Sequence, residues 1–249
     1  MEKTMNQAFN PTDLSGKKIL ITGAAGGIGA ASARLCSAHG AEVALVDIFG
    51  EDAIRAAVGD LSGPASFHAC DTSKRDEVIE LARSTGPVYA LVDCAAICPP
   101  DDWMDDSWDA ALDRTIEVNI KGPANLTRAY FPMMAEQGEG RIILFGSVAG
   151  WMGGLRSGPH YAFTKGGIHA FTRWLAQRGA SSNVLVNAIA PGPIDTPMIS
   201  GRGYEAEAYP LKRLAAPEEV GAFVLLLCAP GGAFASGAIF DVNGATHLR

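Results

Sequence analysis

The sequence has few cysteines and histidines and no arrangement of them that suits a metal or a redox centre. Its five cysteines are an odd number, and no spacing between them matches a Cys-x-x-Cys motif. We therefore expect reduced, buried thiols in a cytoplasmic protein. The five histidines are scattered without a partner at metal-ligand spacing, so no metal site is predicted.

Positive charge and long apolar runs are also scarce. Lys and Arg total 20 against 27 Asp and Glu, which gives a net charge of -7. With no basic run, neither nucleic acid nor an anionic membrane is expected as a partner. No apolar stretch approaches the ~18 residues of a membrane span. Residues 1–13 are polar, lack a signal-peptide pattern and are expected to form a flexible arm.

What the sequence does contain is an alternation of apolar β-type runs and helical segments. Strands are expected at 17–22, 41–47, 65–70, 88–93, 141–146, 184–189 and 238–242. Helices are expected at 27–39, 51–58, 73–84, 106–137, 159–178 and 217–228, the fourth of which Gly122 and Pro123 could break.

The strands are continuous apolar runs, which is typical of a parallel sheet buried on both faces. Their alternation with helices predicts an α/β fold: a doubly wound, mostly parallel, Rossmann-like sheet with helices on both faces. We expect one catalytic domain over residues 14–249. A Gly-, Pro- and Tyr-containing substrate loop is expected around 191–214.

A glycine-rich segment, Thr22-Gly-Ala-Ala-Gly-Gly-Ile-Gly29, directly follows the first expected strand. Glycines let backbone N–H groups approach a pyrophosphate, and the N-terminus of the next helix favours its charge. A glycine cluster alone could be a structural turn, but the strand-to-helix context favours a dinucleotide site. The candidate cofactor residues of this segment are Gly23, Gly27, Ile28 and Gly29.

Asp47 ends the second expected strand, 18 residues after Gly29. A carboxylate there can accept hydrogen bonds from an adenosine ribose diol and would repel a 2′-phosphate. The next residues are Ile48, Phe49 and Gly50, so no adjacent cation could hold that phosphate. The segment therefore favours NAD over NADP, although Asp47 could also cap the following helix.

Tyr161 and Lys165 are four residues apart within the fifth expected helix, which places both side chains on one face. At ~4 Å and an effective dielectric of ~20, the ammonium would favour the phenolate by about 4 kcal/mol, or roughly three pKa units. Tyr161 would then be a usable base nearer neutral pH. The same spacing also arises by chance on half-exposed helices.

Further segments lie in a recognisable order along the chain: Asp71-Thr72, Asn119 within Val118–Gly122, Ser147 placed 14 residues before Tyr161, Pro191-Gly192-Pro193-Ile194-Asp195-Thr196, and Ala238 to Gly244. Together with the glycine loop and the tyrosine–lysine pair, they resemble the short-chain dehydrogenase/reductase superfamily in its compact one-domain branch. The resemblance extends from about residue 14 to the C-terminus. One departure is Asp93-Cys94-Ala95-Ala96, where the family usually has N-N-A-G.

The resemblance implies a role for each matching position. Tyr161 would be the acid/base, Ser147 would stabilise charge on the substrate oxygen, and Asn119 would bind a water that links Lys165 to solvent. Lys165, with Tyr161 beside it, would also hold the nicotinamide ribose. The remaining implied cofactor contacts are Asp71, Thr72, Cys94, Ala95, Pro191, Gly192, Ile194 and Thr196.

The expected function is an NAD-dependent oxidoreductase acting on a secondary alcohol or ketone. Two alternatives remain: a 3-oxoacyl-carrier-protein reductase of the same superfamily, and a non-catalytic dinucleotide-binding regulator. An apolar pocket wall that includes Trp151 is expected to contact the substrate. Arg156 and Arg202 could admit an anionic group or could simply be solvated. The resemblance also implies a homotetramer or homodimer.

Overall fold

The computed structural model describes residues 9–99, 103–154 and 156–249. Seven parallel strands form one sheet in the order β3-β2-β1-β4-β5-β6-β7. Their bounds are β1 Lys18–Thr22, β2 Glu42–Asp47, β3 Ala65–Ala69, β4 Ala90–Asp93, β5 Gly140–Phe145, β6 Val184–Pro191 and β7 Ile239–Val242. The order reverses between β1 and β4, and ligands of open α/β sheets bind beyond the carboxyl ends of strands at such a switch point.

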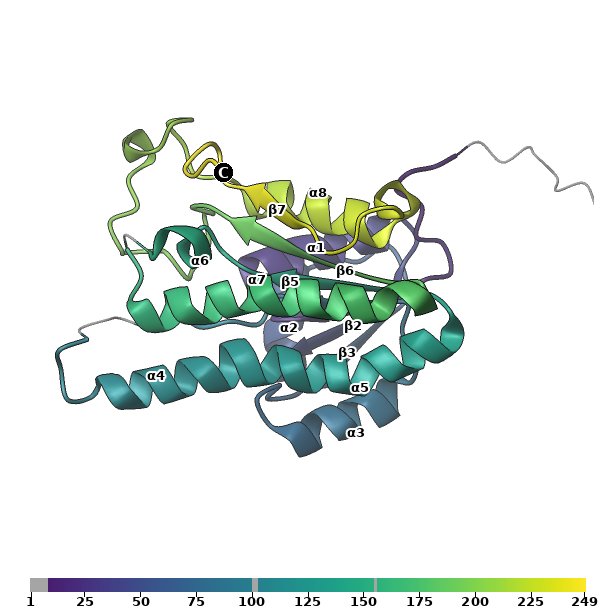
Figure 1. Cartoon of the computed structure of the whole chain (residues 1–249). Coiled ribbons are helices and arrows are strands. Elements are labelled where there is room, and N and C mark those ends of the chain that lie inside the picture. The colour runs from purple at the N-terminus through teal and green to yellow at the C-terminus, as the bar shows by residue number, and fades with distance from the viewer. Residues whose placement is uncertain (1–8, 100–102, 155) are drawn as a thin grey trace, which may run out of the picture.

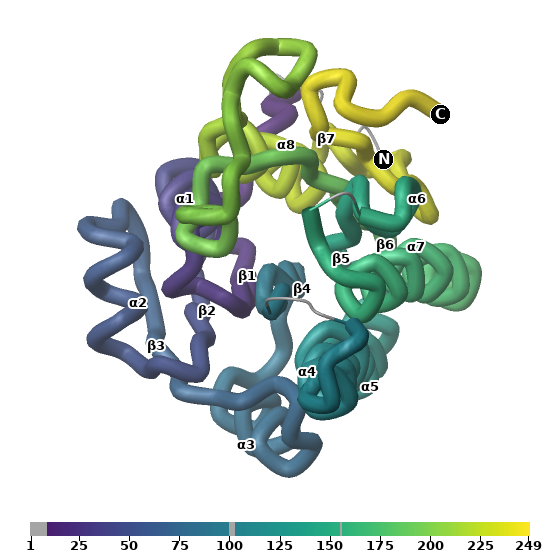
Figure 2. The backbone as a smooth tube through the Cα atoms, turned by 90° about the vertical axis from the view of Figure 1, so that its left-hand side faces the viewer, coloured from purple at the N-terminus to yellow at the C-terminus, as the bar shows by residue number. Residues whose placement is uncertain are grey.

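Helices cover both faces of the sheet (Figures 1 and 2). Helices α1 (Gly27–Ala38), α2 (Gly50–Val58) and α8 (Pro217–Cys228) pack on one face. Helices α3 (Arg75–Thr85), α5 (Gly122–Gln137) and α7 (Pro159–Gly179) pack on the other. The predicted doubly wound Rossmann-like fold is confirmed.

The continuous apolar strands explain this two-faced packing. Along β1, Ile19 and Ile21 enter the core beneath α1 and α8, whereas Leu20 enters the core beneath α5 and α7. All three side chains are fully buried. Each contributes roughly 1.5–3 kcal/mol by leaving water, and alternate side chains reach both cores because successive residues of a strand point to opposite faces.

The long helix expected at 106–137 is divided into two α-helices by a π-helical turn. Helix α4 spans Trp108–Ile116, the π-helix spans Glu117–Lys121, and α5 follows with Pro123 in its first turn. Proline is tolerated there because its missing N–H would have no intrahelical partner. The π-turn carries Asn119, and such turns often occur at functional sites.

Two short elements follow β5 and β6: α6 (Ala149–Met152), and a 3₁₀ turn at Ala206–Ala208 within the expected substrate loop. Residues 1–8 of the expected N-terminal arm lie outside the described residues. Beyond them, the Pro11 carbonyl accepts a hydrogen bond from Gly231 N–H at 2.9 Å. Over the described ranges, no helix is both long enough and apolar enough to span a bilayer.

Candidate active site

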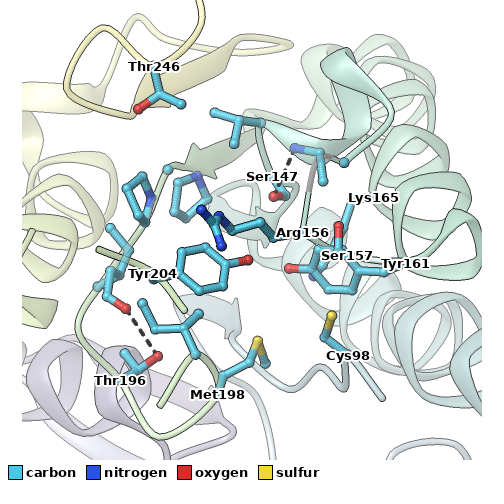
Figure 3. A pocket seen from close by; sticks show the side chains of 18 of the residues that line it. Cys98, Ser147, Arg156, Ser157, Tyr161, Lys165, Thr196, Met198, Tyr204 and Thr246 are labelled. Atoms are coloured by element: carbon cyan, nitrogen blue, oxygen red, sulfur yellow. Dashed lines mark hydrogen bonds between the residues drawn. The ribbon is translucent and has the colours of Figure 1, made fainter. Parts of the chain in front are cut away.

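A cavity of about 300 Å³ opens at the carboxyl ends of the central strands. Figure 3 shows Ser147, Tyr161 and Lys165 along one wall and Thr196, Met198 and Tyr204 along the opposite wall. The predicted residues that line it are Ile28, Cys94, Ser147, Tyr161, Lys165, Pro191, Gly192, Ile194 and Thr196. Those outside the lining are Gly23, Gly27, Gly29, Asp47, Asp71, Thr72, Ala95, Asn119 and Trp151.

The glycine loop between β1 and α1 fits a pyrophosphate. Gly23 has φ +62°, and a Cβ there would lie 2.9 Å from Ala95 N. A Cβ on Gly27 would lie 2.8 Å from the Thr196 methyl group. Helix α1 has no side-chain cap and no acidic residue in its first turn. Its first N–H groups and its dipole can therefore meet a phosphate.

Asp47 lies at the end of β2, beside the glycine loop. Its Oδ2 accepts a hydrogen bond from Ala25 N–H at 3.0 Å, and its Oδ1 accepts one from Phe49 N–H at 3.2 Å. Each carboxylate oxygen has about two lone pairs, so capacity remains to accept ribose hydroxyls. Asp47 therefore supports the two flanking loops and can still face an adenosine ribose.

The Tyr161 phenol is held in its protonated form. Burial raises its pKa, and nearby Cys98 acts in the same direction, against a hydrogen bond with Ser147 and the charge of Arg202. The Lys165 ammonium lies 5.5 Å from the Tyr161 ring centroid and donates to the Phe145 carbonyl at 2.8 Å. The expected lowering of the phenol pKa by Lys165 is therefore corrected, because desolvation dominates at this position.

The charge of a buried carboxylate, Asp93, acts on Lys165. Burial lowers the pKa of Lys165 to about 8, and the Asp93 charge opposes this fall. Burial raises the pKa of Asp93 to about 6, against the hydrogen bond from Thr22 and the charge of Lys165. Thr22 Oγ1 donates to Asp93 Oδ1 at 2.5 Å, across paired strands β1 and β4. Asp93 thus stands where the resembled family usually has asparagine, and its charge reaches Lys165.

Ser147 is held in place from helix α7 by His169, a residue for which the sequence indicated no role. The Ser147 N–H donates to His169 Nε2 at 3.4 Å, and Ser147 Oγ accepts from Ala149 N–H at 3.1 Å. Burial lowers the pKa of His169 to about 4, so the imidazole stays neutral and can accept. The available signal was its spacing: His169 follows Tyr161 by eight residues and Lys165 by four, on the same helix face.

The Asn119 side chain joins β4, the π-turn and α7. Its Oδ1 accepts from Ile97 N–H at 2.9 Å, and its Nδ2 donates to the Ile97 carbonyl at 2.9 Å and to Thr164 Oγ1 at 3.2 Å. Both the oxygen and the nitrogen of the amide are thus hydrogen-bonded, the nitrogen to Thr164, which precedes Lys165 on α7. The amide links these segments, and the water-binding role that the resemblance implies for Asn119 stays a prediction.

Asp71 and Thr72, the expected cofactor contacts after β3, lie in a local hydrogen-bond network. The Asp71 carboxylate accepts from Ser73 Oγ at 2.6 Å and lies 3.4 Å from Arg114 Nη2. The Asp71 N–H donates to Glu77 at 2.8 Å, and Thr72 is buried. Asp71 therefore fixes the turn that leads into α3.

Trp151 lies away from the cavity. Its indole N–H donates to Asp241 Oδ1 at 3.2 Å, and its ring centroid lies 4.1 Å from that of His169. Arg173 and Arg249 lie over the ring. Trp151 packs against the core and is absent from the cavity lining, which includes the next residue, Met152, so the expected substrate contact gains no support from its position.

Comparisons with known proteins agree with this geometry. A family model described as enoyl-(acyl carrier protein) reductase matches residues 23–247. An uncharacterized short-chain type dehydrogenase/reductase of Sinorhizobium fredii is 35% identical, over 93% of this chain and 97% of its own. The cis-4-hydroxycyclohexanecarboxylate dehydrogenase of Sinomonas cyclohexanicum is also 35% identical, over 90% and 94%.

Solved structures are similar over nearly the whole chain. A Brucella melitensis 3-oxoacyl-[acyl-carrier protein] reductase with bound NAD has a TM-score of 0.86 at 31% identity, covering 100% of this chain and 99% of its own. A putative 2-deoxy-D-gluconate 3-dehydrogenase from Agrobacterium tumefaciens with bound NADP has a TM-score of 0.86 at 28% identity, covering 95% and 98%. Both kinds of nicotinamide dinucleotide therefore occur among the structural relatives.

Proposed function

Because the chain belongs to the short-chain dehydrogenase/reductase superfamily and is an oxidoreductase of that family, we propose that it transfers a hydride between NAD(H) and a secondary alcohol or ketone. The observation that carries this proposal is the shared wall of Ser147, Tyr161 and Lys165 in a cavity next to the glycine loop. The relative named for cis-4-hydroxycyclohexanecarboxylate supports a cyclic alcohol as one kind of substrate.

Bound NAD(H) would supply the hydride acceptor or donor; the chain's own residues must handle the proton. Burial keeps the proton on Tyr161, so its hydroxyl can give that proton to a carbonyl oxygen during reduction. Ser147 can donate a hydrogen bond to the same oxygen and stabilise the negative charge that develops there. Lys165, with a pKa of about 8, can hold ribose hydroxyls and return a proton towards Tyr161.

The choice of NAD over NADP rests on Asp47. Its carboxylate is 8% exposed beside the glycine loop, and no Lys or Arg follows it within Ile48–Gly50. The 2′-phosphate of NADP would lie near this carboxylate and would be repelled by its negative charge. We propose NAD as the cofactor on this ground.

One assay tests both parts of this proposal. The purified protein is given NAD or NADP with a panel of secondary alcohols, and reduced cofactor is followed by absorbance. The wild type should prefer NAD. Asp47→Ala should lower the ratio of kcat/KM with NAD to kcat/KM with NADP about 10-fold or more. Asp60→Ala, which removes an exposed carboxylate elsewhere, is the control and should leave the ratio unchanged. A wild-type preference for NADP would contradict the cofactor assignment.

A 3-oxoacyl thioester reductase is the second candidate, supported by the Brucella structure and by the description of the family model. Acetoacetyl-CoA in the same assay separates it from an alcohol dehydrogenase. A non-catalytic regulator would bind the dinucleotide without turning over any substrate. The presence of Ser147, Tyr161 and Lys165 together in the cavity favours catalysis over that reading.

We further propose one catalytic domain over residues 14–249, a cytoplasmic location and a homotetramer or homodimer. Helix α7 supports the assembly because Phe163 is 61% exposed and Trp174 is 50% exposed on it. Large exposed aromatic side chains on one helix are unusual for a monomer. Ile168 on the same helix does not contribute to this surface, because it is buried in the core of this chain.

A further inference from the structure

The cavity is basic in a protein that is acidic as a whole. The chain has a net charge of -7. Among the described residues, the lining nevertheless includes Arg156, Lys165 and Arg202 and no Asp or Glu. Lys165 belongs to the proposed catalytic machinery. The two arginines need a separate explanation. A charged side chain in a cavity is unfavourable unless it is paired with an opposite charge or remains in contact with water.

Neither arginine is paired with a carboxylate of the described chain. Six of the eleven other arginines lie within ion-pair distance of an Asp or Glu of the described chain: Arg34, Arg55, Arg83, Arg114, Arg213 and Arg249. By contrast, Arg202 Nη1 donates to Cys98 Sγ at 3.6 Å. The Arg156 guanidinium lies 5.7 Å from the Tyr204 ring centroid. A guanidinium has five N–H donors, and a thiol and a ring face leave most of them available.

The two guanidinium groups approach the cavity from different segments. Arg156 comes from the loop between α6 and α7, and Arg202 comes from the loop after β6. Figure 3 shows Arg156 extending into the cavity between Tyr204 and the wall that carries Tyr161. The charge of Arg202 acts on the phenols of both Tyr161 and Tyr204. Cationic groups thus lie close to the position where the carbonyl would react.

The cofactor does not account for these charges. Its pyrophosphate is assigned to the glycine loop and the N-terminus of α1, whereas the arginines belong to loops beyond β5 and β6. Around them the lining is apolar, with Met152, Met198 and Ile199. The cavity therefore combines an apolar body with a cationic end.

We propose that Arg156 and Arg202 bind a carboxylate of the substrate, which makes the substrate class a hydroxy acid or keto acid whose carboxylate and reacting carbon are separated by an apolar body. The inference rests on the proposed function, because that function places the reacting carbon at Tyr161. Arginine suits the task since its planar fork can donate two parallel hydrogen bonds to a carboxylate.

Matched ketones test the proposal. The probes are 4-oxocyclohexanecarboxylate, its methyl ester and cyclohexanone, together with the linear pair 4-oxopentanoate and 2-pentanone. The wild-type kcat/KM with NADH should be at least about 10-fold higher for each acid than for its neutral partner. Arg156→Gln and Arg202→Gln should each lower kcat/KM for the acids about 10- to 100-fold. Each variant should keep kcat/KM for the ester and the neutral ketones within about 3-fold of the wild-type value.

Two variants serve as controls. Arg202→Lys keeps the charge but loses the fork, and should retain part of the preference for acids. Arg83→Gln removes an exposed arginine on α3, and should leave every ratio unchanged. Melting temperatures of all variants show whether a loss reflects unfolding.

A binding measurement separates failure of the inference from failure of the proposed function. Calorimetry with cyclohexanecarboxylate and cyclohexanol, with and without NAD, requires no turnover. Ketone reduction without a preference for acids, or with equal losses for acid and ester in the arginine variants, would overturn the carboxylate site and leave the oxidoreductase in place. Arginine-dependent binding of the carboxylate without turnover of any ketone would support the site and contradict the proposed reaction.

Discussion

Replacing Asp93 by asparagine should make the protein more stable at neutral pH. The Asp93 side chain is 3% exposed, and burial raises its pKa to about 6 from the usual 3.8. Asparagine keeps an oxygen that can accept the Thr22 hydroxyl while removing the buried charge. It also restores the residue that the resembled family usually has at this position.

The sign and size of the effect follow from linkage. A carboxyl group whose pKa is higher in the folded than in the unfolded protein stabilises the fold while it is protonated. That contribution is complete below about pH 4 and is lost as the pH rises through about 6. Roughly two pKa units correspond to about 3 kcal/mol. This figure already includes the attraction of Lys165, which opposes the rise in the Asp93 pKa.

Urea unfolding of both proteins between pH 4.5 and 7.5 measures the difference. The Asp93→Asn variant should gain little at the acidic end and up to about 3 kcal/mol at pH 7, because only the wild type must ionise a buried acid. Asp60→Asn, an exposed carboxylate, is the control and should follow the wild type. A difference that stays constant with pH, or shrinks as the pH rises, would refute the reasoning.

Three further predictions concern the site and the assembly. Gly146→Ala should lower the melting temperature and reduce kcat at least about 10-fold. A Cβ at this position would overlap the His169 imidazole, which accepts a hydrogen bond from the Ser147 N–H. Thermal unfolding and steady-state kinetics measure the two effects. Ketone reduction should slow and alcohol oxidation should accelerate as the pH rises through about 8, because Lys165, whose pKa burial lowers to about 8, then loses the proton that it returns towards Tyr161, while the raised pKa of Tyr161 keeps the phenol itself protonated; kcat/KM profiles in both directions check the sign. Phe163→Glu with Trp174→Glu should shift the protein to a smaller assembly in light scattering, and an unchanged mass would contradict the proposed interface on α7.

The architecture could be predicted because it depends on local patterns. Continuous apolar strands of the β1 type can only be buried from both sides, and glycines between a strand and a helix indicate a phosphate-binding turn. The positions of Ser147, Tyr161 and Lys165 on one cavity wall were likewise expected from their order along the chain. The π-turn that divides the 106–137 helix was not expected. The Gly122-Pro123 pair indicates a break there, whereas the π-turn lies just before it, at Glu117–Lys121.

Electrostatics inside the site could not be predicted from spacing. The i, i+4 relation between Tyr161 and Lys165 suggested a lowered phenol pKa, but the size of desolvation depends on segments far apart in sequence. Asp93 and Lys165 are 72 residues apart in the sequence, and only the folded chain brings the Asp93 charge within reach of Lys165. The direction of a single side chain could not be predicted either: Trp151 packs against the core and bonds Asp241, while its neighbour Met152 lines the cavity.

The acid–base role of Tyr161 is tested most directly by single-turnover hydride transfer in Tyr161→Phe. Stopped-flow absorbance follows NADH oxidation with a ketone that the wild type reduces, and fluorescence titration measures NADH binding to the same protein. The hydroxyl lies in the cavity and supplies the proton, so transfer should slow by about 10³-fold while the Kd for NADH stays within about 3-fold. Transfer at a rate near that of the wild type, with the cofactor bound, would contradict the assignment.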